Sequence, residues 1–317
     1  MNNKKIIFIG GTGRCGTNIL GKILSNNKKV FLLPQFRFML DPDGVIDFIT
    51  SFKHSWSPYL IDLKYKRLEL LLNSFESSSI NNLYLKLPNY LKKMVRKRFY
   101  GILPRYYSSN INQMCPNYSH IKKEFISKLY DIIYSAKWVG KNNMNTANMY
   151  YLGPRKLLSD VILNFYYALI EDTKKYDGQE YIVDNNTWNH LYFNGIVELN
   201  QSFKLLHLAR QPKDVICSFT QQAWMPDDLK QSSIIYKGLI DRWNEVSSEL
   251  KDDDYLNISF EELIKNTRFN LKKICSFTGL DWDENMLNVD LKLANIDRWK
   301  IDLSKEESAL IDSVLEN

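Results

Sequence analysis

The pattern of apolar and polar positions predicts a chain that alternates strands and helices. Segments with apolar residues at helical spacing, such as Ser119–Trp138 and Asp160–Lys175, alternate with strand-length apolar runs. These runs lie at Lys4–Ile9, Val30–Leu33, Tyr181–Val183, Phe203–Leu208 and Tyr255–Ile258. Such an order favours an α/β fold: a central parallel sheet with helices on both faces and ligands at the carboxyl ends of the strands.

Capping signals indicate where several helices begin and end. Apolar positions after residue 18 predict a helix that Asn26-Asn27 ends, and Pro212 is well placed in the first turn of another. Ser259-Phe260-Glu261-Glu262 has the spacing of a capping box, so a helix should start there and end at Gly279. Ser304-Lys305-Glu306-Glu307 repeats the spacing before a terminal helix.

The segment from about residue 50 to 118 lacks this regularity. It is rich in aromatic and basic residues, as at Met94–Tyr100 and Arg105–Tyr107. We interpret it as an irregular or helical insertion in a single domain that spans residues 1–317. Its basic side chains suit a solvated surface, and they would equally suit a surface that binds a sugar or an acidic acceptor.

Composition narrows the class of protein. The 317 residues, 44% hydrophobic and 25% charged, are typical of a globular chain that buries a sizeable core. No apolar run approaches the roughly 20 residues of a membrane helix, and no secretory signal is visible, so we expect a cytoplasmic protein without a membrane partner. The 42 basic and 36 acidic residues give a net charge of +6, which hints at anionic ligands without indicating nucleic acid.

Cysteine and histidine positions argue against a metal site and a disulfide scaffold. No two cysteines form a CxxC pair, and no two histidines have the i, i+4 spacing of a helical metal site. The residues concerned are Cys15, Cys115, Cys217 and Cys275, and His54, His120, His190 and His207. We therefore expect a reaction without a metal.

A glycine-rich loop follows the first strand. Gly11-x-x-x-x-Gly16-Thr17-Asn18 has P-loop spacing, and the backbone N–H groups of such a loop hold an anion at a helix N-terminus. Thr17 replaces the usual lysine and Asn18 the usual magnesium-binding hydroxyl, which leaves Arg14 as the cation of the loop. The loop thus suits an anion with less charge than a nucleoside triphosphate, such as a sulfuryl group, bound without a divalent metal. A plain turn between strand and helix is the alternative.

A second group of polar residues follows the strand Phe203–Leu208. Arg210 lies at the carboxyl end of this strand, and Ser218 lies two turns along the next helix. An arginine and a serine so placed can bind a phosphate together. Taken alone, Arg210 could instead belong to an ion pair at the strand end.

Together the two motifs resemble those of the sulfotransferases that use 3′-phosphoadenosine 5′-phosphosulfate (PAPS), whose fold is a P-loop-like three-layer αβα domain. The resemblance implies that Arg210 and Ser218 hold the 3′-phosphate, and that Arg298 and Lys300, in a segment similar to the family's C-terminal one, reach the nucleotide. It also implies that the 5′-phosphosulfate is held by Gly13, Arg14, Cys15, Gly16, Thr17 and Asn18.

The resemblance further implies in-line transfer of a sulfuryl group to a hydroxyl or amine of a glycan or small-molecule acceptor. Arg14 would stabilise charge on the bridging oxygen. The chain most resembles the branch that sulfates glycans and protein tyrosines, together with its bacterial relatives. In that branch a glutamate base follows the second strand, but the matching residue here is Gln35, whose amide cannot take a proton. The other candidate bases are Asp184, at a strand end and therefore first, His54 and His190; each could instead be structural.

Two other functions remain open. Gln35 supports a non-catalytic relative that binds a nucleotide or glycan, and Asn185-Asn186, where many relatives carry lysine, is a second departure. An ATP-dependent small-molecule kinase with a degenerate loop is the other alternative, although its lysine and hydroxyl are missing. The acceptor and the oligomeric state do not follow from the sequence.

Overall fold

The computed structural model describes residues 4–76, 86–99, 111–136, 147–153, 158–291 and 295–316. The chain divides into two compact units. Residues 1–36 and 179–317 form the first, which we call the sheet unit, and residues 37–178 form the second, the inserted unit.

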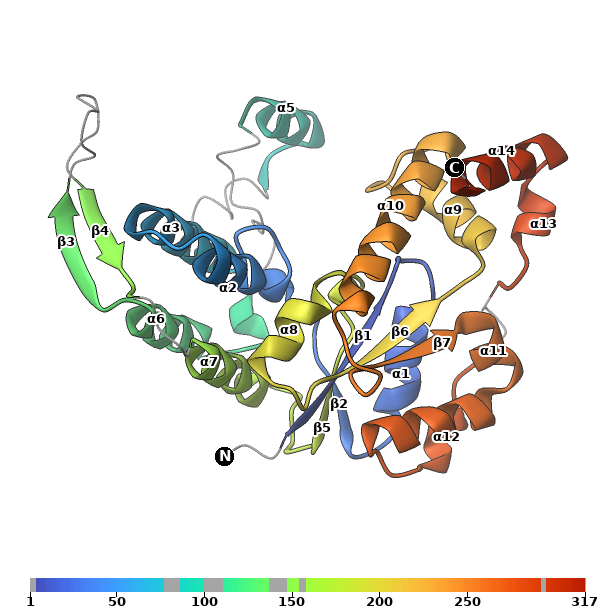
Figure 1. Cartoon of the computed structure of the whole chain (residues 1–317), viewed down its shortest axis with the longest axis horizontal. Helices are drawn as coiled ribbons and strands as arrows, with labels where there is room; N and C mark the ends of the chain where they lie inside the picture. The colour runs from blue at the N-terminus through green and yellow to red at the C-terminus, as the bar shows by residue number, and fades with distance from the viewer. Residues whose placement is uncertain are drawn as a thin grey trace. The chain divides into compact units, whose positions relative to one another are not determined.

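The sheet unit contains five parallel strands in the order β2-β5-β1-β6-β7 (Figure 1). Each neighbouring pair is parallel, and β1 lies at the centre between β5 and β6. The strands are β1 (Lys5–Gly11), β2 (Val30–Leu32), β5 (Tyr181–Asp184), β6 (Lys204–Ala209) and β7 (Tyr255–Ser259). All five predicted strands are therefore present, and the α/β prediction is confirmed.

Helices cover both faces of this sheet. The cluster on one face joins β1 to α1, α11 and α12, and η3 and α8 pack on the other face. The helices are α1 (Thr17–Ser25), α8 (Phe193–Leu199), α9 (Pro212–Thr220), α10 (Leu229–Ser248), α11 (Phe260–Lys265), α12 (Thr267–Thr278), α13 (Trp299–Asp302) and α14 (Lys305–Glu316), with 3₁₀ turns η3 (Asn189–Tyr192) and η4 (Glu284–Leu287). The result is a three-layer αβα arrangement.

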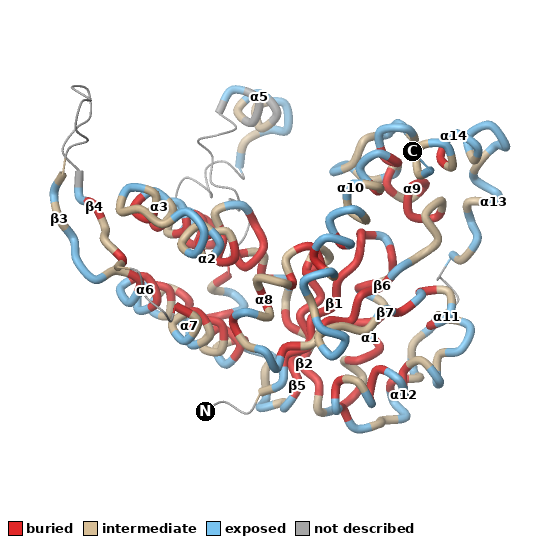
Figure 2. Tube along the Cα trace, viewed as in Figure 1, coloured by how far each residue is buried: buried red, intermediate tan, exposed pale blue. Residues whose placement is uncertain are grey.

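Strand β1 shows why the sequence folds in this way. Side chains alternate across a strand, so Ile7 and Ile9 pack toward Leu20 of α1 while Phe8 points to the opposite face. The ring of Phe8 lies 5.9 Å from that of Phe193 in α8. A strand covered on both faces must be apolar throughout, and Figure 2 shows β1 as buried.

In the sheet unit, the predicted starts and ends of helices are confirmed, with one correction. Helix α9 begins at Pro212, and the Ser259 hydroxyl accepts a hydrogen bond from the Glu262 N–H at the start of α11. The single helix expected from there to Gly279 is wrong, because the backbone leaves the helical region at Asn266 (φ −123°, ψ 49°) and divides it into α11 and α12. Gly279 ends α12 in a left-handed conformation (φ 71°).

The inserted unit is mainly helical. It contains η1 (Arg37–Met39), α2 (Val45–His54), α3 (Pro58–Ser74), α5 (Asn89–Phe99), η2 (Ile111–Gln113), α6 (Tyr118–Lys128), β3 (Ile132–Ala136), β4 (Ala147–Tyr151) and α7 (Ser159–Asp172). Helix α7 confirms the helix predicted at Asp160–Lys175. The basic and aromatic stretch at 94–99 lies in α5, and Tyr100 and Arg105–Tyr107 lie outside the described residues.

The helix predicted over Ser119–Trp138 is wrong beyond Lys128. Helix α6 ends there, and the chain forms an antiparallel hairpin in which Ile132 and Ile133 pair with Tyr151 and Tyr150. The isoleucines continue the helical spacing of the preceding segment, but they are β-branched, and a distant partner strand decides their conformation. Residue spacing alone cannot reveal that partner.

Two histidines are buried side by side in the sheet unit. The ring of His207, in β6, stacks on Trp243 with centroids 4.2 Å apart and lies 5.3 Å from the ring of His190. Its Nδ1 is 2.8 Å from Oδ1 of Asn257. Burial lowers the pKa of His207 to about 4 and holds the pKa of His190 well below its usual range. Both rings are therefore neutral at pH 7.

This burial predicts a loss of stability in mild acid. The unfolded chain binds protons on these histidines below pH 6.5 and the folded chain does not, so stability is full above pH 6.5 and falls as the pH drops. His207 alone should lower the free energy of unfolding by about 2 kcal/mol between pH 7.5 and 5.0. Guanidinium unfolding of wild type and His207→Phe at both pH values measures the difference. His54→Gln, which alters an exposed histidine, should keep the wild-type pH dependence; an unchanged dependence in His207→Phe would contradict the prediction.

Candidate functional site

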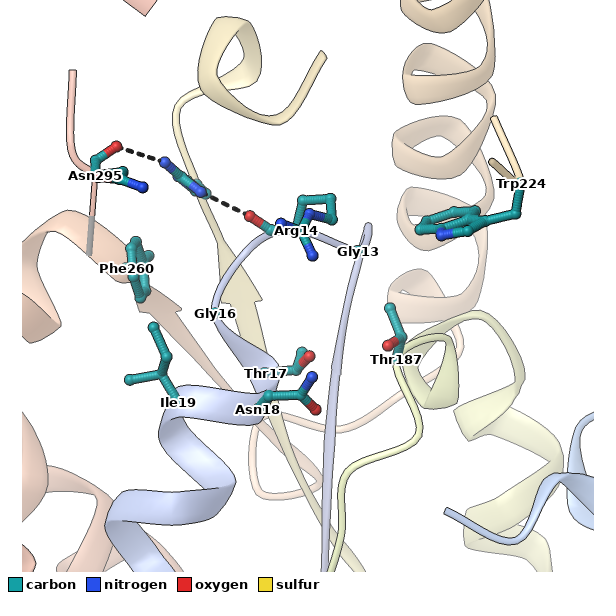
Figure 3. A pocket seen from close by; sticks show the side chains of 11 residues that line it. Gly13, Arg14, Gly16, Thr17, Asn18, Ile19, Thr187, Trp224, Phe260 and Asn295 are labelled. Atoms are coloured by element: carbon teal, nitrogen blue, oxygen red, sulfur yellow. Dashed lines mark hydrogen bonds between the residues drawn. The ribbon is translucent and has the colours of Figure 1, made fainter. Parts of the chain in front are cut away.

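Two adjacent cavities lie at the carboxyl ends of the central strands of the sheet unit. The larger, of about 310 Å³, is lined by the loop after β1 and the start of α1, together with Thr187, Arg210, Trp224, Phe260 and Asn295 (Figure 3). The smaller, of about 90 Å³, shares Arg14, Arg210 and Asn295 with it and adds, among others, Ser218 and Arg298. Ligands of open α/β sheets bind at this edge, where the strand order reverses beside β1.

Left-handed backbone conformations shape the loop after β1. Gly13, Arg14 and Gly16 have φ values of 96°, 56° and 96°. A Cβ atom added to Gly16 would lie 2.3 Å from the ring of Phe260, so only glycine fits at this turn. Helix α1 starts at the next residue, and the N–H groups of its first turn lack partners within the helix. These groups and the positive end of the helix dipole form a place for an anion.

The predicted binding residues of the loop face in different directions. Gly13, Arg14, Gly16, Thr17 and Asn18 line the larger cavity. The side chain of Cys15 is instead fully buried in the core, where burial raises the pKa of its thiol. Only the backbone of this cysteine remains available to a ligand.

Arginine side chains connect the loop to the second motif. Nη1 of Arg210 donates to the carbonyl of Arg14 and Nη2 to the carbonyl of Asn295, both at 2.8 Å. Nε of Arg14 donates to Oγ of Ser218 at 2.8 Å. Residues 204 positions apart in the sequence therefore meet, and the two predicted motifs lie side by side.

Buried donors in this site lack acceptors. Nε of Arg210 and Nε1 of Trp299 are both buried, and neither has a hydrogen-bond partner among the residues that the structure describes. Both residues line the smaller cavity. Because an unpaired buried donor is costly, the pair fits a ligand that supplies oxygen atoms at this position.

Of the two C-terminal residues expected to reach a nucleotide, the structure brings one to the site. Arg298 lines the smaller cavity, where its Nε donates to Asp302 at 2.8 Å. Lys300 is paired with Asp297 at 2.8 Å and lines neither cavity.

Three neutral amides meet beside the start of α1. Nε2 of Gln35 donates to Oδ1 of Asn18 at 3.3 Å and to the carbonyl of Asn185 at 3.2 Å. Nδ2 of Asn185 donates to the same oxygen of Asn18 at 3.1 Å. Amides donate and accept hydrogen bonds but do not take up protons at neutral pH. This group, which we call the amide cluster, can therefore orient a ligand but cannot act as a base.

The other candidate bases lie elsewhere. Asp184 is buried, and its carboxylate accepts hydrogen bonds from the backbone and side chain of Asn186 and from Nδ2 of Asn189, so it holds the loop after β5. His190 is in the core beside His207, and neither Asp184 nor His190 lines either of the two cavities described above. His54 ends α2 in the inserted unit and is exposed.

Several lining residues were not assigned a role from the sequence. Phe260 directly follows β7, so the strand-end rule that pointed to Arg210 could have found it. Trp224 is 52% exposed although it is a large aromatic residue, and its ring centroid lies 6.1 Å from that of Trp188. In the view of Figure 3, Phe260 and Asn295 lie on one side of the loop and Thr187 and Trp224 on the other. No local signal in the sequence marks Trp224 or Asn295.

The described residues contain neither a cluster that could hold a metal nor a helix that could cross a membrane. Within the described ranges, no group of three His, Cys, Asp or Glu side chains could hold a metal ion. The helices in that part of the chain are all too short or too polar to span a bilayer.

The chain is similar to several known sulfotransferases. The 3-beta-hydroxysteroid sulfotransferase of Cavia porcellus is 30% identical over 105 residues, which cover 29% of this chain and 37% of that enzyme. Among solved structures, the sulfotransferase domain of the Synechococcus PCC 7002 olefin synthase has 17% identity and a TM-score of 0.45, with 99% of this chain and 88% of that one covered. The sulfotransferase domain from the curacin biosynthetic pathway has 14% identity and a TM-score of 0.48, with coverages of 99% and 97%.

A family model provides the assignment. The model described as the sulfotransferase family matches residues 7–284. This match includes the loop after β1 and the Arg210–Ser218 motif, the two segments that meet in the site. The chain belongs to the sulfotransferase family.

Proposed function

We propose that this chain transfers a sulfuryl group from PAPS to a hydroxyl or amine of a small-molecule or glycan acceptor. The observation that carries the proposal is the contact between the two anion-binding segments. Arg210 binds the carbonyl of Arg14, Arg14 binds Ser218, and Nε of Arg210 is left buried without an acceptor among the described residues.

The two cavities suit the two ends of a doubly phosphorylated nucleotide. In the proposal, the larger cavity receives the 5′-phosphosulfate on the loop Gly13–Asn18 and on the first turn of α1. The smaller cavity receives the 3′-phosphate, with Arg210, Ser218 and Arg298 as its ligands. Phe260 and Ile19 give the larger cavity an apolar wall that suits a planar base.

The residues present also fit the chemistry of sulfuryl transfer. PAPS supplies a sulfuryl group already bonded to a phosphate leaving group. Arg14 and the N-terminus of α1 would stabilise negative charge on that phosphate as the bond breaks. The amide cluster would donate hydrogen bonds to oxygen atoms beside it. Because Gln35 cannot accept the proton of the acceptor, acceptors that ionise near neutral pH should react most readily.

One observation favours a second candidate. Gln35 stands where the resemblance implies a glutamate base, and its side chain is hydrogen-bonded to the other neutral amides of the cluster. A relative that binds the nucleotide and a glycan without transferring sulfate would need no base. Such a protein would share the nucleotide site and lack turnover with every acceptor.

The proposal predicts selective stabilisation by adenosine 3′,5′-bisphosphate. At about 100 times its dissociation constant, this ligand should add about 2.7 kcal/mol to the free energy of unfolding, and AMP at the same concentration should add less because it lacks the 3′-phosphate. Thermal unfolding with each ligand, and with ATP and Mg²⁺, makes the comparison. Stabilisation by ATP with Mg²⁺ alone would favour the kinase.

Arg210→Ala should weaken binding of the bisphosphate about tenfold or more, because it removes a charge-assisted contact, and should change AMP binding less than threefold. Isothermal titration calorimetry measures both affinities. Arg268→Ala is the matched control, since Arg268 is exposed, pairs with Glu284 and lines neither cavity. The assignment of the 3′-phosphate site fails if Arg210→Ala and the control bind the bisphosphate equally.

The amide cluster predicts how the rate depends on the acceptor. With a series of phenols and an aliphatic alcohol, wild type should favour the most acidic phenols. Gln35→Glu should raise the rate with the alcohol about tenfold or more, because a carboxylate can serve as general base. Gln35→Ala controls for loss of the hydrogen bonds. Rates of sulfate transfer from PAPS at pH 7.5 provide the test, and a Gln35→Glu rate no higher than that of Gln35→Ala would exclude this position as the site of the base.

A further inference from the structure

Residues 295–299, which we call the strap, form part of the wall of the smaller cavity, and one buried carboxylate fixes them there. Asp214 lies in the first turn of α9 and is 3% exposed. Its Oδ2 accepts the N–H of Asp297 and its Oδ1 accepts the N–H of Trp299, both at 3.0 Å. Both oxygens of this side chain therefore bind the backbone of a segment more than 80 positions away.

The strap adopts a conformation that needs such support. Asn295 and Asp297 have φ values of 44° and 61°, in the left-handed region that residues other than glycine adopt at a cost. Such backbone persists where surrounding contacts determine it. Asp214 supplies two of these contacts, and Arg210, which donates to the carbonyl of Asn295, supplies a third.

The carboxylate of Asp214 also helps to position the two arginines that line the smaller cavity. Its Oδ2 lies 3.5 Å from Nη2 of Arg210. Arg298 lies between the two residues whose N–H groups Asp214 binds, so the position of its backbone depends on those bonds. Both arginines line the smaller cavity, as does Trp299, whose indole N–H is buried. Fixing the strap thus places two cations and one buried donor around a single space.

We infer that Asp214 is a positioning residue that fastens the strap beside the smaller cavity and thereby sets the preference of the site for a nucleotide with a 3′-phosphate. The inference rests on the proposed function for the identity of the nucleotide. Asp214 itself binds no phosphate; it acts through Arg210, Arg298 and the strap backbone.

Electrostatics alone gives the opposite expectation. A carboxylate beside a phosphate repels it, so removal of Asp214 would tighten phosphate binding if this residue were only a neighbour of the cavity. If it is a positioning residue, removal must weaken binding. The direction of the change therefore distinguishes the two roles.

Asp312, which pairs with Lys213 beside Asp214, offers a matched control. Lys213 binds Asp312 at 2.7 Å and Ser308 at 2.8 Å, and its ammonium lies 4.8 Å from the ring centroid of Trp299. Asp312→Asn would loosen α14 from α9 and leave every bond of Asp214 in place. Asp312 lines neither cavity.

The test compares affinities for adenosine 3′,5′-bisphosphate and AMP by isothermal titration calorimetry. In Asp214→Asn the preference for the bisphosphate should fall at least tenfold relative to wild type, with AMP affinity changed less than threefold. Asp312→Asn should keep the wild-type preference. An Asp214→Asn preference equal to or greater than that of wild type overturns the inference.

A second measurement follows the strap directly and needs no nucleotide. Asp214→Asn, or Asp214→Glu if the first variant does not fold, should be cleaved by trypsin after Arg298 and Lys300 at least tenfold faster than wild type and Asp312→Asn, as mass spectrometry can measure. If a folded Asp214 variant is cleaved at the same rate as wild type, Asp214 does not hold the strap in place and the inference is overturned.

The two readouts separate the failure of this inference from that of the proposed function. If wild type shows no preference for the bisphosphate, the proposed nucleotide is wrong, and the cleavage rates still decide whether Asp214 fastens the strap. If wild type shows the preference and Asp214→Asn keeps it, Asp214 is not a positioning residue.

Discussion

The close packing of the turn at Gly16 against Phe260 is the constraint on which the site depends. The turn joins β1 to α1, and Phe260 joins β7 to α11, so this contact connects the centre of the sheet to its edge at the carboxyl ends of the strands. Phe260 also lies under the guanidinium of Arg210, 5.3 Å from ring centroid to Cζ. One aromatic ring thereby fixes both the anion loop and the arginine that binds it. The left-handed glycine is needed because a side chain cannot enter this space.

The features that could be predicted are those that short stretches of sequence determine. The five strands are short apolar runs bounded by turn residues, and the carboxyl end of a strand marks where a ligand binds. Position alone made Arg14 and Arg210 candidates, and the resemblance to a family added Ser218 and the role of each. The structure brings the three side chains together. Contacts between distant segments could not be predicted. Strand β3 lies in a segment whose spacing predicts a helix, and the backbone at Asn266 divides a segment whose spacing predicts one continuous helix.

The candidate bases show a similar limit. Asp184 lies at a strand end, as a ligand-binding residue would, yet its Oδ1 accepts three hydrogen bonds from the loop that follows it. His190 is only a few positions further and is enclosed in the core. The position of Asp184 at a strand end was predicted correctly, but the direction of a side chain depends on the partners that surround it. Trp224 and Asn295 line the larger cavity because of the way distant segments pack, and no local sequence signal marks them.

The connection between β2 and β5 gives the inserted unit a further meaning. These strands are parallel neighbours, so the chain that leaves the carboxyl end of β2 must return to the amino end of β5, at the opposite edge of the sheet. Residues 37–178 make up most of that crossover, which is much longer than the single helix that would suffice. A shortened relative could lose much of this unit, but a connection of a dozen or more residues would have to remain. The length of the crossover can thus change among relatives while the sheet and its anion loop stay the same.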